Sequence, residues 1–122
     1  MNDHRKLRAF ELADQLVLGI YAATKSFPRD EQFGLTSQLR RAAISIPSNI
    51  VEGCGRSSRA DYVRFLDISL GSAREVEYQI TLAQRLGYMT DDEAAPLSQQ
   101  ASETTKVLTG LIRSLRKNTK AP

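Results

Sequence analysis

Apolar residues recur at steps of three and four positions in four stretches of the chain. These stretches span about residues 10–24, 35–53, 59–86 and 91–117. At 3.6 residues per turn, this spacing places the apolar side chains of each stretch on one face of a helix. Short connections between the stretches predict an all-α, antiparallel up-down four-helix bundle, with residues 1–122 forming a single domain. We expect residues 1–8 and 118–122 to fray at its ends.

The clearest apolar face belongs to the second stretch, at Leu35, Leu39, Ala42, Ala43, Ile46 and Ile50. Pro47 conflicts with this pattern, because it removes one backbone hydrogen bond and costs about 3 kcal/mol in an ordinary helix interior. Either one kinked helix or two helices meeting at Pro47 would result, and the unbroken phase of the apolar face favours the kink. Asp30 and Thr36 are both candidate caps at its start. Gly53 and Gly55 are expected to end it in a left-handed conformation.

A regular polar stripe lies about a quarter-turn from this apolar face. Its members are Gln38, Arg41, Ser45, Asn49 and Glu52. Two interpretations of the stripe remain open. It satisfies the backbone near Pro47 and pairs with neighbouring helices, or it forms a seam in which Arg41 and Glu52 find partners on another subunit, and the two roles can coexist.

The third stretch carries two apolar faces. Its main face includes Phe65, Leu66 and Ile80. The second face consists of Ile68, Leu82 and Leu86, with Gly71 and Glu75 between them. A helix that is apolar on two faces is buried on both. Because so small a domain has one core, we interpret the second burial as contact with another subunit, with close backbone approach at Gly71.

Several residues of the second and third stretches form a pattern that points to a family. The pattern comprises Gln38, Arg41, Ser45-Ile46-Pro47, Asn49-Ile50, Glu52-Gly53, Phe65-Leu66, Ile68 and Gly71-Ser72. It resembles the bacterial four-helix-bundle proteins that are associated with intervening sequences in large-subunit ribosomal RNA genes. The fold also resembles the accessory protein of diversity-generating retroelements, which works beside a reverse transcriptase and RNA. These resemblances imply a ring-shaped homopentamer whose partner is RNA, DNA, a reverse transcriptase or another nucleic-acid enzyme.

The charge of the chain is compatible with an acidic partner. Its formal net charge is +3, and no acidic residue follows Glu103. The candidate nucleic-acid-binding residues are Arg113, Arg116, Lys117 and Lys120 near the C-terminus, and Arg40, Arg56 and Arg59 near the ends of the second and third helices. Such a basic run is also typical of a solvated helix end, where cations complement the helix dipole. An oligomer would repeat the basic surface, and binding would then depend on phosphates rather than on base sequence.

Residues with catalytic chemistry are few and separated. Cys54 is the only cysteine and His4 the only histidine, and His4 precedes every predicted helix. This arrangement favours neither a Cys–His nucleophile nor a metal site. Glu75 and Glu77 lie two positions apart and cannot share a helix face. No apolar run approaches the ~20 residues that span a bilayer, and no apolar segment of a secretory signal is visible.

The sequence therefore predicts a non-enzymatic, cytoplasmic, oligomeric bundle without a cofactor, a metal or a membrane partner. We expect it to act as a scaffold that binds RNA or DNA through a repeated basic surface. The alternative is a purely structural or protein–protein interaction module that has no nucleic-acid partner.

Overall fold

Every regular element that the structure describes is helical. The computed structural model describes residues 2–119. It contains the short 3-10 helices η1 (His4–Lys6) and η2 (Arg29–Glu31) and the α-helices α1 (Arg8–Thr24), α2 (Leu35–Cys54), α3 (Arg59–Arg85) and α4 (Asp91–Thr119). No strand occurs between residues 2 and 119, which confirms the predicted all-α fold.

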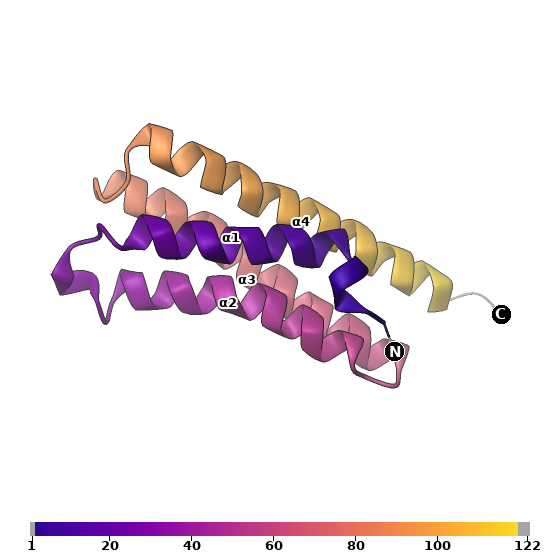
Figure 1. Ribbon diagram of the computed structural model, residues 1–122. Helices are drawn as coiled ribbons and strands as arrows, with labels where there is room; N and C mark the ends of the chain where they lie inside the picture. The colour runs from indigo at the N-terminus through magenta and orange to yellow at the C-terminus, as the bar shows by residue number, and fades with distance from the viewer. Residues whose placement is uncertain (1, 120–122) are drawn as a thin grey trace.

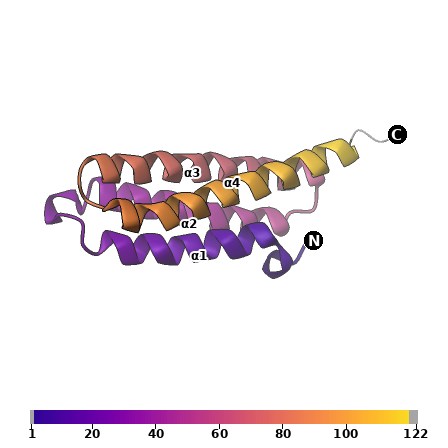
Figure 2. The same cartoon turned by 90° about the horizontal axis from the view of Figure 1, so that it is seen from above.

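The α-helices run alternately up and down along one bundle axis (Figures 1 and 2). α1 packs against α2 and α4, and α3 packs against the same two helices. This arrangement confirms the antiparallel four-helix bundle that the short connections predict. Within residues 2–119, none of the helices combines the length and the apolar character that crossing a bilayer requires.

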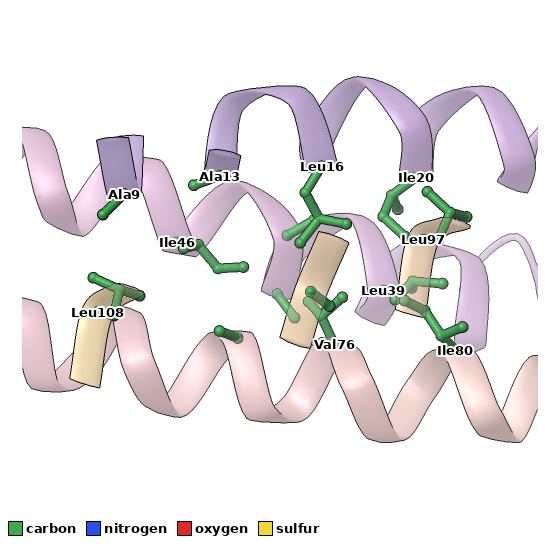
Figure 3. Packing of buried hydrophobic residues seen from close by; sticks show 14 of the residues in the cluster. Ala9, Ala13, Leu16, Ile20, Leu39, Ile46, Val76, Ile80, Leu97 and Leu108 are labelled. Carbon is green, nitrogen blue, oxygen red and sulfur yellow. The ribbon is translucent and has the colours of Figure 1, made fainter. Parts of the chain in front are cut away.

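The core lies along the bundle axis, where one apolar stripe from each helix meets the others. Figure 3 shows buried side chains from all four helices in this space, among them Leu16, Ile20, Leu39, Ile46, Val76, Ile80, Leu97 and Leu108. Burying an aliphatic side chain of this size contributes about 1.5–3 kcal/mol relative to leaving it in water. The stripes therefore supply the main driving force that holds the helices together.

Phe65 is an exception among the residues predicted to fill the core. Leu66 beside it is fully buried, whereas Phe65 is only partly buried. The guanidinium groups of Arg56 and Arg64 lie 4.7 and 4.5 Å from the centre of its ring. The prediction for Phe65 is therefore wrong, because a turn of 100° per residue directs Leu66 into the axis and leaves Phe65 at the edge.

α2 passes through Pro47 as one helix and does not break into two. Pro47 has no N–H, so one carbonyl of the preceding turn loses its usual donor. Side chains donate to other carbonyls close by: the Ser69 hydroxyl bonds the Ile46 carbonyl, and the Asn49 amide bonds the Ser45 carbonyl, both at 2.8 Å. Ser69 is fully buried, so its bond also ties α3 to α2. The unbroken spacing of the apolar residues favours one helix over two, and α2 is one helix.

Neither of the two predicted cap residues takes that role at the start of α2. Gly34 is the N-cap residue, and the Glu31 carboxylate accepts a hydrogen bond from the Leu35 N–H at 3.0 Å. The same carboxylate accepts a bond from the Tyr88 hydroxyl at 2.8 Å. Both donors favour the charged form, so the Leu35 N–H and then the Tyr88 hydroxyl lower the pKa of Glu31.

α2 ends at Cys54, close to the glycines that predict its end, but without a left-handed cap. Gly55 has a φ of −84°, and Gly87 after α3 is the one residue of the described chain with a positive φ, 80°. Gly53 instead marks a close approach of two helices. A Cβ at Gly53 would lie 3.0 Å from the Phe65 Cβ. The missing side chain thus lets α2 pack closely on α3.

Residues 2–8 are folded, in contrast to the fraying expected for residues 1–8, and Met1 lies outside the described residues. η1 forms there, and the Asn2 N–H donates to the Cys54 carbonyl at 3.1 Å. The sequence pattern misses this contact because its two partners are far apart along the chain. At the other end, α4 continues to Thr119, and residues 120–122 of the predicted frayed end lie outside the described residues.

Candidate nucleic-acid interface

A groove with basic walls lies between the middle of α3 and the second half of α4. It has a volume of about 650 Å³. Its lining consists of Asp67, Leu70 and Arg74 from α3 and of Thr109, Ile112, Arg113, Arg116 and Lys117 from α4. These positions are mostly three or four residues apart within each helix, so one face of α3 and one face of α4 form the walls. We call this hollow the α3–α4 groove.

The charges of the α3–α4 groove are unbalanced. Four cations, at Arg74, Arg113, Arg116 and Lys117, surround one carboxylate, at Asp67. Arg116 forms an ion pair with Asp67, whereas the other three cations make no ion pair with any residue between 2 and 119. Ile112 in the floor is buried. The four cations are exposed to solvent, so water and salt screen them in part, and their excess over Asp67 gives the groove a local positive potential.

The Asp67–Arg116 ion pair also borders a second, smaller hollow. This hollow has about 380 Å³ and is lined by Ala60, Val63, Arg64, Asp67 and Arg116. Arg64 differs from Arg74, Arg113 and Lys117, because its Nε lies 3.7 Å from an Asp61 carboxylate oxygen and its guanidinium lies over Phe65. The ion pair therefore stands between a strongly basic hollow and a largely apolar one.

The structure brings together only part of the basic surface predicted from sequence. Arg113, Arg116 and Lys117 share the α3–α4 groove. Arg40 lies elsewhere, where its Nε donates to the Thr24 hydroxyl at 2.8 Å and its guanidinium stacks over Tyr21.

The remaining predicted cations do not line the groove either. Arg56 pairs with Glu52 at 3.0 Å, and Arg59 is exposed at the first position of α3. Lys120 lies outside the described residues. Of the basic surface that the sequence predicts, only three cations thus share one groove of the single chain.

Arg74 is the groove cation that sequence reasoning missed, as it also missed the groove carboxylate of Asp67. It lies seven residues after Asp67 on α3, which is two helical turns and therefore the same face. The nearby acidic residues Glu75 and Glu77 give this segment charges of both signs, so Arg74 does not stand out as part of a basic cluster. Antiparallel pairing of α3 with α4 is the signal that places Arg74 opposite the basic end of α4.

A second groove, between α2 and α3, collects part of the predicted polar stripe. It has about 440 Å³ and is lined by Gln38, Arg41, Ala42, Ser45, Ser72 and Glu75. The Ser72 hydroxyl donates to the Ser45 hydroxyl at 2.8 Å, and the Asn49 amide donates to the same hydroxyl at 3.0 Å. Ser45 and Asn49 are thus satisfied within the chain. We call this hollow the α2–α3 groove.

The two charged members of the polar stripe differ in their surroundings. Glu52, in the last turn of α2, pairs with Arg56, which directly follows the C-cap of the same helix. Arg41 is exposed and makes no ion pair with any residue from 2 to 119. The internal role predicted for the stripe accounts for Ser45 and Asn49, and a subunit seam stays a prediction for Arg41.

The second apolar face predicted on α3 lies largely at the surface of the single chain. Ile68 and Leu86 are 42% and 50% exposed, whereas Leu82 is partly buried and packs against the core. A Cβ at Gly71 would meet no other atom of the described chain within 4 Å. The close approach predicted at Gly71 is therefore not made inside this chain, and a contact with a second chain stays a prediction.

Cys54 and His4 lie in surroundings that are poor for catalysis. Burial raises the pKa of the Cys54 thiol, and burial also raises the pKa of Tyr62, whose hydroxyl lies 4.0 Å from the sulfur, to about 12. The thiol is therefore protonated at neutral pH. The His4 ring packs edge-on against Phe10. No group of three metal-ligating side chains occurs within residues 2–119.

Comparisons with known proteins agree with the observed fold. One similar solved structure is a protein of unknown function from the S23 ribosomal protein family of Bacteroides thetaiotaomicron. It is 28% identical, has a TM-score of 0.79, and aligns over 85% of this chain and 97% of its own. None of the curated proteins compared with the chain matches it. Residues 5–110 match the model of the family described as 23S rRNA-intervening sequence protein, and the chain therefore belongs to that family.

Proposed function

We propose that this protein is a non-enzymatic, homo-oligomeric scaffold that binds RNA or DNA through the phosphates in its α3–α4 groove. The observation that carries the proposal is the excess of cations there: Arg74, Arg113, Arg116 and Lys117 face one carboxylate. Arginine presents a planar fork of donors that suits phosphate oxygens. The family description, which refers to intervening sequences of 23S rRNA, supports RNA as the first polymer to test.

Binding of this kind depends on salt and only weakly on base sequence. Phosphate contacts release condensed counterions, so the logarithm of affinity falls by about 0.7 per neutralised phosphate of a single strand for each tenfold rise in salt. The groove has a net charge of +3 if Asp67 is counted against its four cations. We therefore expect one groove to lose roughly twentyfold in affinity between 50 and 200 mM salt.

Fluorescence anisotropy of a labelled, unstructured RNA provides the test. We expect the triple variant Arg113→Gln, Arg116→Gln, Lys117→Gln to lose on the order of a hundredfold in affinity at 50 mM salt and to show a flatter salt dependence. Its matched control removes three cations, at Lys25 and Arg29 in the connection from α1 to α2 and at Arg85 at the end of α3. These segments lie at the end of the bundle opposite to the end of α4 (Figure 1).

Two outcomes would contradict the proposed binding. Equal losses in both triple variants would show that net charge, and not the groove, determines affinity. If the unaltered protein binds no RNA or DNA at 50 mM salt, the function is that of a structural or protein-interaction module. Circular dichroism of each variant establishes that the helices are retained.

Assembly is the second part of the proposal, and the exposed side of α3 supports it. Ile68, Gly71 and Leu86 are exposed on this side, and the α2–α3 groove beside it offers Arg41 and Glu75 without an ion pair in the described chain. A second copy of the chain can bury the apolar residues and pair the charged ones. Each copy then adds one α3–α4 groove to a shared basic surface.

Light scattering at micromolar concentration tests the assembly. We expect several times the chain mass of 13.6 kDa, with five copies expected from the family resemblance. Ile68→Glu should lower this mass, because it would place an unpaired charge in the seam. The control is Leu18→Glu, at a residue of α1 that is 67% exposed. A monomeric unaltered protein would contradict this part.

A further inference from the structure

The Asp67–Arg116 ion pair occupies a particular place in the α3–α4 groove. Asp67 is the one acidic residue in the lining, and it neutralises one of the four cations. The pair joins α3 to α4 and borders both neighbouring hollows. An anion that enters the groove therefore meets three cations directly and a fourth that already holds a carboxylate.

The ion pair is exposed enough to be exchanged. The side chains of Arg116 and Asp67 are 55% and 42% exposed. Water and salt screen such a pair, and exposed ion pairs contribute little to stability. The guanidinium of Arg116 can bind a phosphate with the same fork of donors that it offers to a carboxylate. Phosphate and Asp67 are thus competitors for one arginine.

We propose that Asp67 acts as a built-in competitor for phosphate, so that nucleic-acid binding requires Arg116 to exchange the Asp67 carboxylate for a phosphate group of the polymer. This inference rests on the proposed function. Breaking the Asp67–Arg116 ion pair is then part of the free-energy cost of binding. Asp67 thereby limits affinity and lets the polymer dissociate readily.

The variant Asp67→Asn isolates this effect, because asparagine keeps the shape of the side chain and removes its charge. We expect the variant to bind single-stranded RNA about three- to tenfold more tightly than the unaltered protein at 50 mM salt. Its groove has one more net positive charge, so its salt slope should be steeper by about 0.7. The gain in affinity should therefore shrink about two- to threefold between 50 and 200 mM salt.

A matched control separates the local effect from net charge. Asp14→Asn makes the same charge change at an exposed position of α1, a helix that does not line the groove. We expect Asp14→Asn to change RNA affinity by less than about twofold, because Asp14 is exposed, contributes nothing to the groove lining, and is screened by water and salt. Equal gains from the two variants would overturn the role of Asp67.

A double-mutant cycle tests the exchange itself. If Asp67→Asn increases RNA affinity because Arg116 no longer pairs with a carboxylate, the fold-increase in affinity should be at most half as large when Arg116→Gln is also present. The gain should persist in a Lys117→Gln background, because Lys117 makes no ion pair with Asp67. An equal gain in both backgrounds would show that Asp67 repels phosphate directly, and it would overturn the exchange.

The outcomes distinguish this inference from the function on which it rests. If neither the unaltered protein nor the Asp67→Asn variant binds RNA or DNA at 50 mM salt, the proposed function fails. If both bind and Asp67→Asn behaves like Asp14→Asn, the proposed function stands and the competitor role alone is wrong.

Discussion

Helix α3 lines two grooves, and their chemistry differs sharply. The α2–α3 groove contains short hydrogen-bonding side chains, with one cation at Arg41 and one acid at Glu75. The α3–α4 groove contains four cations and one acid. One groove is thus suited to pairing with a polar protein surface, and the other to holding an anionic polymer.

The proposed function assigns a different role to each of the two sides of α3. Consecutive residues of α3 point in directions about 100° apart. Arg74 therefore lines the groove with α4, and the adjacent Glu75 lines the groove with α2. A subunit contact on the α2–α3 side would leave the α3–α4 groove open to solvent. The charged residues proposed for assembly and the residues proposed for nucleic-acid binding therefore line different grooves.

The largest expected effect concerns the buried side of α3, which holds both grooves in place. Leu66→Ala should destabilise the fold by about 2–5 kcal/mol, because Leu66 is fully buried and its removal leaves a cavity. Phe65→Ala should cost less, because Phe65 is only partly buried. Urea denaturation of both variants measures the difference. A larger loss at Phe65 would contradict its placement at the edge.

Alanine substitutions at Gly53 and Gly71 should change the stability of the single chain in opposite directions. Gly53→Ala should destabilise the protein by about 1–3 kcal/mol, since its Cβ would crowd Phe65 at 3.0 Å. Gly71→Ala has free space in the single chain, and alanine is favoured by about 1 kcal/mol in a helix interior. If Gly71 lies in a subunit seam, the same change should instead lower the oligomer mass in light scattering.

Single cations in the two grooves provide a direct comparison of binding. Arg74→Gln should weaken RNA binding by about three- to tenfold at 50 mM salt, because it removes one phosphate contact. Arg41→Gln, in the α2–α3 groove, should change it by less than about twofold. Anisotropy titrations under identical conditions measure both. Similar losses would mean that the grooves are not functionally distinct.

The smallest effect concerns Glu31, at the end of the bundle remote from the α3–α4 groove. The Leu35 N–H and the Tyr88 hydroxyl lower its pKa below the ordinary value of 4.5. A lowered pKa adds stability above the unfolded pKa, and this stability is lost as pH falls through the lower, folded pKa. Glu31→Gln should therefore lower the melting temperature slightly at pH 7, with a smaller difference below about pH 4.

The RNA affinity of the Glu31→Gln variant is the second quantity to measure. The substitution removes a negative charge, as Asp67→Asn does, yet it should leave RNA affinity unchanged within about twofold. A marked gain in affinity would indicate that net charge governs binding and would remove the distinction between the two grooves.

Hydrophobic periodicity alone determined the fold class of this protein and most of its core. Positions such as Leu39, Ile46 and Leu108 follow from steps of three and four, because burial of one face per helix is the dominant favourable energy. The basic end of α4 was also predicted from the sequence, since Arg113, Arg116 and Lys117 lie close together along the chain.

Tertiary structure alone decided which charges share a groove. Arg74 and Asp67 become part of the site only because α3 packs antiparallel to α4, and Arg40 leaves it because α2 packs against α1. The cap that Glu31 provides with Tyr88 likewise joins residues 57 positions apart. Local patterns specify which face of each helix is buried, but contacts between distant segments depend on how the helices pair in space.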